Sequence, residues 1–194
     1  MKLNIYIISN PISELLSNSI YRIKDNKYSQ YSDKYKYISL FLIYEIFRKY
    51  LKIQKVYIKY AYSIKDLYTT YPKKKNFILT NISQTYKMLT DVTNIIPNIE
   101  IINIEYNKIN ELSIIEAENI INMYHNPNIL ILEEILNSES TIKLLKYLDK
   151  KTSISLEEIN IACIGCYHEI LNKINNIYPQ LKIYTTQIIY NSYK

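Results

Sequence analysis

Two cysteines near the end of the chain are the first candidates for chemistry. Cys163 and Cys166 form a C-x-x-C pair, which can act as a redox dithiol or as half of a zinc site. The chain has no second cysteine pair, and His168 has no partner at ligand spacing. Because the pair lies around an apolar run, 159–165, we predict two core cysteines that remain thiols in a reducing compartment.

A second group of polar side chains follows the apolar run 128–132. It consists of Glu133, Glu134, Asn137, Ser138, Glu139, Ser140 and Thr141. Such a group is a candidate site, because open α/β sheets bind ligands where strand carboxyl ends meet the following loops. A phosphate site there also needs a close approach of the backbone, which glycine allows. The one glycine of the chain, Gly165, lies elsewhere.

Short apolar runs alternate with helical patterns along the chain. We expect strands at 1–9, 76–80, 99–104, 128–132, 159–164 and 182–185. We expect helices at 35–51, 83–95, 140–149 and 168–177, and another beginning near 10–13. Continuous apolar strands, each followed by a helix, indicate an α/β fold with a doubly wound, mainly parallel sheet flanked by helices. No repeat or linker divides the chain, so we expect one domain over 1–194.

The composition excludes several classes of protein. Of 194 residues, 48% are hydrophobic, so the chain is not intrinsically disordered. No stretch reaches about 18 continuous apolar residues, and we expect no membrane span. The net charge is +6, but the lysines are scattered. We interpret the one tight run, Lys73–Lys75, as a solvated loop tip in preference to a phosphate-binding patch, and we expect no nucleic-acid partner.

Several segments resemble uracil phosphoribosyltransferases, in the same order along the chain. The run 129–141 is similar to the family signature, an apolar strand followed by Asp-Pro-Met-Leu-Ala-Thr-Gly-Gly-Ser and a helix. Residues 178–185 resemble His-Pro-Asp-Val-Glu-Ile-Tyr-Thr, and residues 44–48 match a Tyr-Glu-Ile-x-Arg helix. Shorter matches lie at 10–12, 95–97, 163–164 and 169. The resemblance covers nearly the whole chain and implies a type I phosphoribosyltransferase-like fold.

The resemblance also implies a reaction, in which uracil and 5-phosphoribosyl 1-pyrophosphate (PRPP) give UMP and pyrophosphate with the help of Mg²⁺. The signature binds the 5-phosphate of PRPP. Its Asp falls on Glu133 and its Thr on Ser138, while its two glycines fall on Glu139 and Ser140. Side chains in place of glycine deny the backbone its close approach, and a carboxylate there would repel a phosphate.

The loop that would bind pyrophosphate departs from the family pattern as well. Ser83 stands in place of the family Arg and Thr85 in place of a glycine, with Gln84 between them. Serine lacks the planar fork that suits phosphate oxygens. The Gly-rich uracil segment that follows the last family strand has no counterpart between Thr185 and Lys194, so we expect a C-terminally truncated, degenerate homologue.

Both phosphate loops are therefore expected to be vestigial, with no functional catalytic residue, no metal and no cofactor. Mg²⁺ and PRPP would be bound only if activity were retained. We expect a catalytically silent structural or interaction subunit, in a homodimer or a larger complex. The alternatives are an active or weakly active uracil phosphoribosyltransferase and a nucleotide-sensing regulator.

The residue usage bears on location. The chain is rich in isoleucine, asparagine, lysine and tyrosine, with 22 Tyr and no Trp, and these abundant residues have AT-rich codons. Together with the resemblance, this bias favours a plastid-encoded protein in the stroma or on the stromal side of a complex. Otherwise we expect a cytoplasmic protein.

Overall fold

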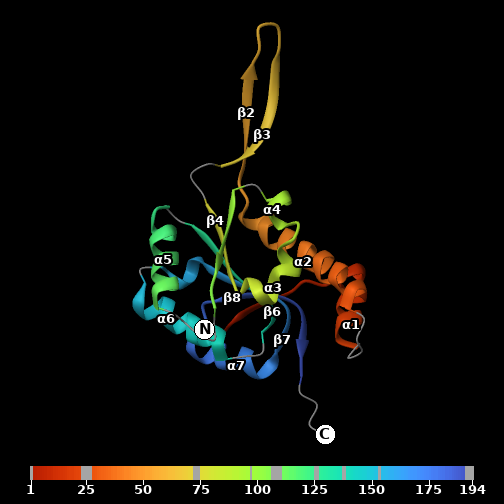
Figure 1. Ribbon diagram of the computed structural model, residues 1–194, viewed down its shortest axis with the longest axis vertical. Coiled ribbons are helices and arrows are strands. Elements are labelled where there is room, and N and C mark those ends of the chain that lie inside the picture. Colours follow the sequence, from red (N-terminus) through yellow and green to blue (C-terminus); the bar gives the residue numbers. More distant parts are fainter. Residues whose placement is uncertain are drawn as a thin grey trace.

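The computed structural model describes residues 2–22, 28–71, 75–96, 98–105, 111–124, 127–136, 139–152 and 154–190. Within them, six strands form one sheet of order β1-β8-β7-β6-β4-β5, and all its pairings are parallel. The strands are β1 (Asn4–Ile7), β4 (Asn76–Thr80), β5 (Ile99–Asn103), β6 (Asn128–Leu136), β7 (Ile159–Tyr167) and β8 (Lys182–Ile189). Helices flank this sheet (Figure 1), which confirms the predicted doubly wound α/β class.

The core has two halves, one on each face of the sheet. The helices are α1 (Pro11–Arg22), α2 (Tyr28–Tyr50), α3 (Ile82–Leu89), α4 (Val92–Ile95), α5 (Glu111–Asn122), α6 (Glu139–Lys151) and α7 (His168–Ile177), with a 3-10 turn, η2 (Leu156–Glu158). Ile129 and Ile131 of β6 pack with α5, α6 and α7, whereas Leu130 and Leu132 pack with α2, α3 and α4. Successive side chains of a strand point to opposite faces, so a strand covered on both faces is apolar throughout.

The order of the strands reverses between β4 and β6. From β4 the chain moves outward to β5, and it then returns to β6 on the other side of β4. Leu79 of β4 lies beside Ile131 of β6, so the carboxyl ends of both strands share one edge of the sheet. Because ligands in such sheets bind at this reversal, we call the edge the switch-point edge.

The predicted bounds of β4 and α7 are correct, but those of β6 and β7 are too short. β6 continues to Leu136, because Ile135 and Leu136 pair with the neighbouring β7. Glu133 and Glu134, which the sequence placed in a loop, are therefore strand residues. The predicted helix 83–95 is divided into α3 and α4, and the bounds of several other elements differ by a few residues.

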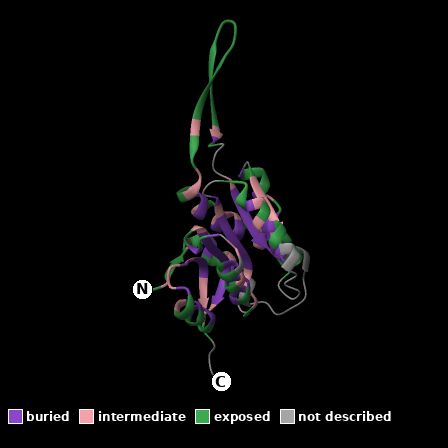
Figure 2. Cartoon of the chain, turned by 90° about the vertical axis from the view of Figure 1, so that its left-hand side faces the viewer, coloured by how far each residue is buried: buried purple, intermediate pink, exposed green. Residues whose placement is uncertain are grey.

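A hairpin that the sequence analysis does not predict projects from the body of the molecule (Figure 1). It consists of β2 (Ile53–Lys59) and β3 (Ile64–Thr70), paired antiparallel, and we call it the arm. Figure 2 shows that most of it is exposed. Its turn, 60–63, contains no glycine, proline or asparagine, and apolar residues occupy both faces, so neither the turn signal nor the period of two is visible in the sequence. Helix α5 is also not predicted.

Candidate functional site

Two threonines join the elements that meet at the switch-point edge. Thr80, the last residue of β4, donates its hydroxyl hydrogen to the carbonyl oxygen of Leu132 at 2.6 Å. The hydroxyls of Thr80 and Thr85 lie 2.7 Å apart, and Thr85 also lies 3.0 Å from the carbonyl oxygen of Asn81. Both threonines are fully buried. Thr80 and Thr85, the second of which is a predicted site residue, therefore link β4, α3 and β6.

The first turn of α3 is where the pyrophosphate would bind according to the resemblance. The side-chain oxygen of Asn81 accepts the N–H of Ser83 at 3.1 Å, and that of Asn103 accepts the N–H of Ile82 at 2.9 Å. The carbonyl oxygen of Asn81 accepts the N–H groups of Gln84 and Thr85, both at 3.0 Å. Anion sites at a helix start use these backbone donors. Here the N–H groups of residues 82–84 are already bonded within the chain, and the N–H of Thr85 makes the first regular bond of the helix, while the Ser83 and Gln84 side chains are exposed.

The end of β6 and the first turn of α6 are where the 5-phosphate would bind. Glu133 is buried, with 6% of its surface exposed, and its carboxyl oxygen accepts the hydroxyl hydrogen of the buried Thr141 at 3.3 Å. The structure therefore places an acidic group under the start of α6. An anion bound at this turn would lie close to a buried carboxyl group, which offers it no positive charge.

The next predicted residue, Glu134, faces a different partner. It is half-buried, and it lies close to the phenol of Tyr35 on α2. Burial, followed by the charge and the hydrogen bond of Glu134, raises the pKa of Tyr35. Glu133 and Glu134 are consecutive in a strand, so they serve opposite faces of the sheet and do not form a carboxylate pair.

Glu139 lies at the start of α6, in place of a family glycine, and is directed to α7. Its carboxylate lies 2.7 Å from the ammonium nitrogen of Lys173, and this hydrogen bond holds the pKa of Glu139 below its usual value. Glu139, Lys143, Lys146 and Lys173 help to line a shallow depression of about 330 Å³. Acidic residues are favoured in a first turn by the helix dipole, so the residue needs no ligand to explain it.

The remaining predicted residues add little. Ser140 is half-buried and has a partner within the chain. Asn137 and Ser138, like Lys73 and Lys74, lie outside the described residues. Lys75 forms an ion pair with Glu100 at 3.3 Å. Of the seven residues predicted around the 5-phosphate loop, the structure thus brings Glu133 and Thr141 together and directs Glu134 and Glu139 elsewhere.

The C-x-x-C pair is buried, as predicted. Cys163 and Cys166 are both free thiols with no exposed surface, and they lie near the carbonyl oxygens of Tyr184 and Gln187 at 3.8 and 3.7 Å. Burial raises the pKa of the Cys163 thiol. Across the described ranges, no three His, Cys, Asp or Glu side chains lie close enough to hold a metal ion.

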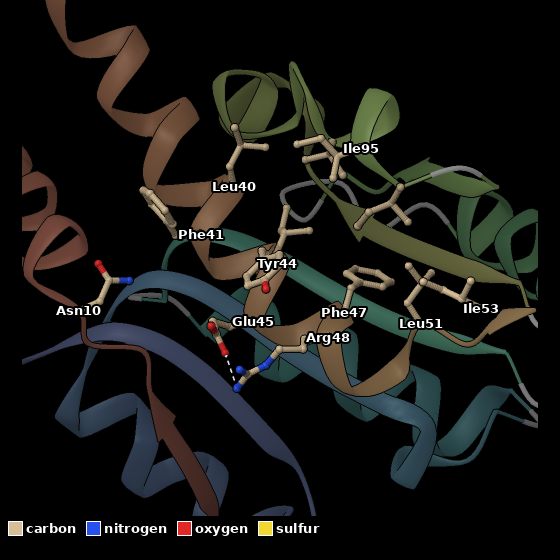
Figure 3. Close-up of a pocket in the computed structure, with 13 residues that line it drawn as sticks. Asn10, Leu40, Phe41, Tyr44, Glu45, Phe47, Arg48, Leu51, Ile53 and Ile95 are labelled. Atoms are coloured by element: carbon tan, nitrogen blue, oxygen red, sulfur yellow. Dashed lines mark ion pairs between the residues drawn. The ribbon is translucent and has the colours of Figure 1, made fainter. Parts of the chain in front are cut away.

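A second candidate surface, which the sequence analysis missed, lies along α2. It is an apolar groove of about 800 Å³, which we call the α2 groove (Figure 3). Its lining consists of Asn10, Leu40, Phe41, Ile43, Tyr44, Glu45, Phe47, Arg48, Leu51, Ile53, Val92, Ile95 and Ile96. Glu45 and Arg48 pair with each other at 2.9 Å, so few polar groups are available inside. The sequence analysis predicts the helix at 35–51 but no groove beside it.

Comparison with known proteins agrees with this fold. No protein-family model matches the chain. It is 26% identical over 188 residues to a Pyropia yezoensis protein described as a uracil phosphoribosyltransferase homolog, and the match covers 97% of this chain and 89% of that protein.

Among solved structures, the AQ2163 protein from Aquifex aeolicus has the same fold, with a TM-score of 0.66 at 14% identity over 98% of this chain and 89% of that one. None of the helices in the described ranges is long and apolar enough to cross a bilayer. The chain is a distant relative of the uracil phosphoribosyltransferase family.

Proposed function

We propose that this chain is a catalytically silent relative of the phosphoribosyltransferases that acts as an interaction subunit. The observation that carries the proposal is the first turn of α3, where the N–H groups of residues 82–84 are bonded to Asn81 and Asn103. A pyrophosphate would have to displace those acceptors. Ser83 offers no guanidinium in exchange.

The second phosphate position supports the same conclusion. The buried Glu133 carboxyl lies under the first turn of α6, and Glu139 adds another acid at the helix start. Neither the buried Glu133 carboxyl nor Glu139, whose carboxylate is paired with Lys173, offers a positive charge to the 5-phosphate of PRPP or to a free nucleotide. In the proposed role, the chain would therefore need neither Mg²⁺ nor PRPP.

The proposed interaction role rests on two apolar surfaces outside the switch-point edge. The arm and the α2 groove expose a large apolar surface, although the core of the domain is complete. Apolar patches of this size on a folded domain mark contact sites for other proteins. The chain would serve as a homodimer or as part of a larger assembly.

Titration of the full chain with PRPP in the presence of Mg²⁺, followed by an assay for UMP from uracil and PRPP, tests the proposal. We expect no binding tighter than about millimolar, which is the weak limit of useful substrate affinity, and no UMP. PRPP binding that is lost in Glu133→Ala, together with UMP formation, would show an active enzyme. Binding of UMP without turnover would show a nucleotide-sensing regulator.

We further propose that the protein works in a plastid, in the stroma or on the stromal side of a complex. The AT-biased residue usage supports this location. Immunodetection in purified plastids, compared with the cytoplasmic fraction, tests it. Recovery of the protein in the cytoplasmic fraction alone would exclude a plastid role.

A further inference from the structure

A row of lysines follows α6, which lies with α7 in the part of the body away from the arm (Figure 1). Lys143, Lys146 and Lys150 are exposed, and their spacings of three and four residues place them on one side of the helix. We call these three lysines the basic strip. They span about 10 Å at about 1.5 Å per residue. Among the residues that the structure describes, no carboxylate lies within ion-pair distance of Lys143 or Lys146.

The basic strip borders the shallow depression of about 330 Å³ between α6 and α7. The two helices run in the same direction: Glu139 at the start of α6 contacts Lys173 in the middle of α7, whereas Lys146 shares the depression with Ile177 at the end of α7. Two isoleucines line the depression, Ile142, which is buried, and Ile177, which is 43% exposed. The depression therefore offers apolar surface beside the charged rim.

Lysines outnumber acidic groups in the described lining of the depression, which contains three lysines and one glutamate. Lys173 and Glu139 pair with each other at 2.7 Å, and Lys143 and Lys146 contribute the remaining positive charge. After the hydrogen bond and charge of Lys173, the charges of these two lysines also hold the pKa of Glu139 below its usual value, so they act on the same small volume. Charge complementarity therefore favours a partner that brings negative charge.

The shape and the lining of the depression distinguish among such partners. A small ligand buries most of its surface in a cleft, and this depression is shallow. Single-stranded nucleic acid stacks its bases on aromatic side chains, and the described lining contains none. That lining also contains no arginine, whose planar fork suits phosphate oxygens. A protein segment that carries carboxylates and an apolar side chain fits this surface best.

We propose that the basic strip and the depression bind an acidic amphipathic helix of a partner protein. The proposal rests on the interaction role proposed above and adds the chemistry of the partner. Carboxylates at spacings of three and four residues on such a helix would face the basic strip, and an apolar side chain beside them would contact Ile177. Helices α6 and α7 cover the face of the sheet opposite to α2, so this partner would leave the α2 groove uncovered.

Fluorescence anisotropy with the full chain and a labelled helical peptide tests the proposal. The peptide has about 20 residues, enough to form a helix, with glutamates at spacings of three and four and a row of leucines beside them. We expect a Kd of roughly 10–100 µM at about 50 mM salt, because exposed ion pairs are individually weak. Binding should be at least about tenfold weaker at about 500 mM salt, which screens such pairs. A second peptide with lysine in place of every glutamate should not bind.

Charge reversal at the basic strip locates the contact. Lys143→Glu with Lys146→Glu should weaken binding of the acidic peptide at least about tenfold, because like charges then face each other. Lys143→Arg with Lys146→Arg keeps both charges and should keep the affinity within about threefold. Lys52→Glu with Lys59→Glu is the matched control, since it makes the same change of net charge at exposed positions beside and within the arm, and it should also stay within about threefold. Circular dichroism checks that each variant is folded.

Four results would overturn the proposal. The acidic peptide does not bind at up to about 1 mM, a concentration that detects even weak complexes. It binds the Lys143→Glu with Lys146→Glu variant as well as the wild type, so that the contact lies elsewhere. It is weakened equally in the control, so that net charge alone attracts it. Inorganic pyrophosphate or poly(U) RNA binds more tightly than the peptide, which would show a phosphate site.

The PRPP titration is run on the same samples, so the two proposals can fail separately. A chain that binds neither PRPP nor the acidic peptide would exclude this partner and leave the silent role intact. A chain that makes UMP and binds the peptide would exclude the silent role and leave the contact at α6 and α7 intact.

Discussion

At the scale of single residues, the switch-point edge shows polar groups used for structure. Thr80, Thr85 and Thr141 are buried and hydrogen-bonded to neighbouring elements. A buried donor without a partner is costly, so such groups bond to the protein or to ordered water. Here the three hydroxyls bond to neighbouring elements of the chain and so contribute to its stability.

The contact between Thr141 and Glu133 should be measurable as stability. Thr141→Val keeps the shape of the side chain but removes the hydroxyl that Glu133 accepts at 3.3 Å. We expect the free energy of unfolding in urea to fall by about 1–2 kcal/mol, the usual cost of weakening a buried hydrogen bond to an acidic group. Thr93→Val, at an exposed position on α4, is the control and should change it by less than about 0.5 kcal/mol. Equal losses in the two variants would mean that the contact contributes nothing.

Two tyrosines make the protein sensitive to alkali. Burial, followed by the hydrogen bond with Tyr50, raises the pKa of Tyr184 above its ordinary value of 10.0, and burial with Glu134 raises that of Tyr35. A raised folded-state pKa stabilises the protein below the unfolded pKa, and this contribution is lost as the pH rises above 10. We expect the urea concentration at the midpoint of unfolding to decrease as the pH is raised from about 9 to about 11. The decrease should be smaller in Tyr184→Phe. A midpoint that stays constant over this range would contradict the assignment.

At the scale of elements, the sequence predicts the strands that are buried on both faces. It does not predict the bounds of elements whose length depends on a neighbouring strand. β4 and α7 have their predicted bounds because apolar runs and a helix pattern mark them clearly. β6 is longer than predicted because its partner β7 continues beside it, which no local pattern reveals. The arm is missed because its turn has no glycine and its two faces are both apolar. Glu139 begins α6, and its partner Lys173 is 34 residues away, so their contact could not be predicted from the sequence.

The first turn of α3 allows a prediction at the element scale. Asn81 caps this helix, since its side-chain oxygen accepts the N–H of Ser83. Replacing a cap residue with alanine costs about 0.5–2 kcal/mol, so Asn81→Ala should lower the free energy of unfolding by about 1 kcal/mol. Gln84→Ala, in the same turn but with an exposed side chain, should have almost no effect. If Asn81→Ala also leaves the free energy of unfolding unchanged, the hydrogen bonds of Asn81 to the start of α3 are weaker than the proposed silent role requires.

At the scale of the whole molecule, the domain has a core on both faces of its sheet, and it exposes apolar side chains on the arm and along α2. Both halves of the core are continuous from strand to helix. Fold and function are separable, because a fold is maintained by packing and a function by a few residues at a site. The apolar surface of the arm and the α2 groove is therefore the part of the molecule that a function without catalysis would preserve.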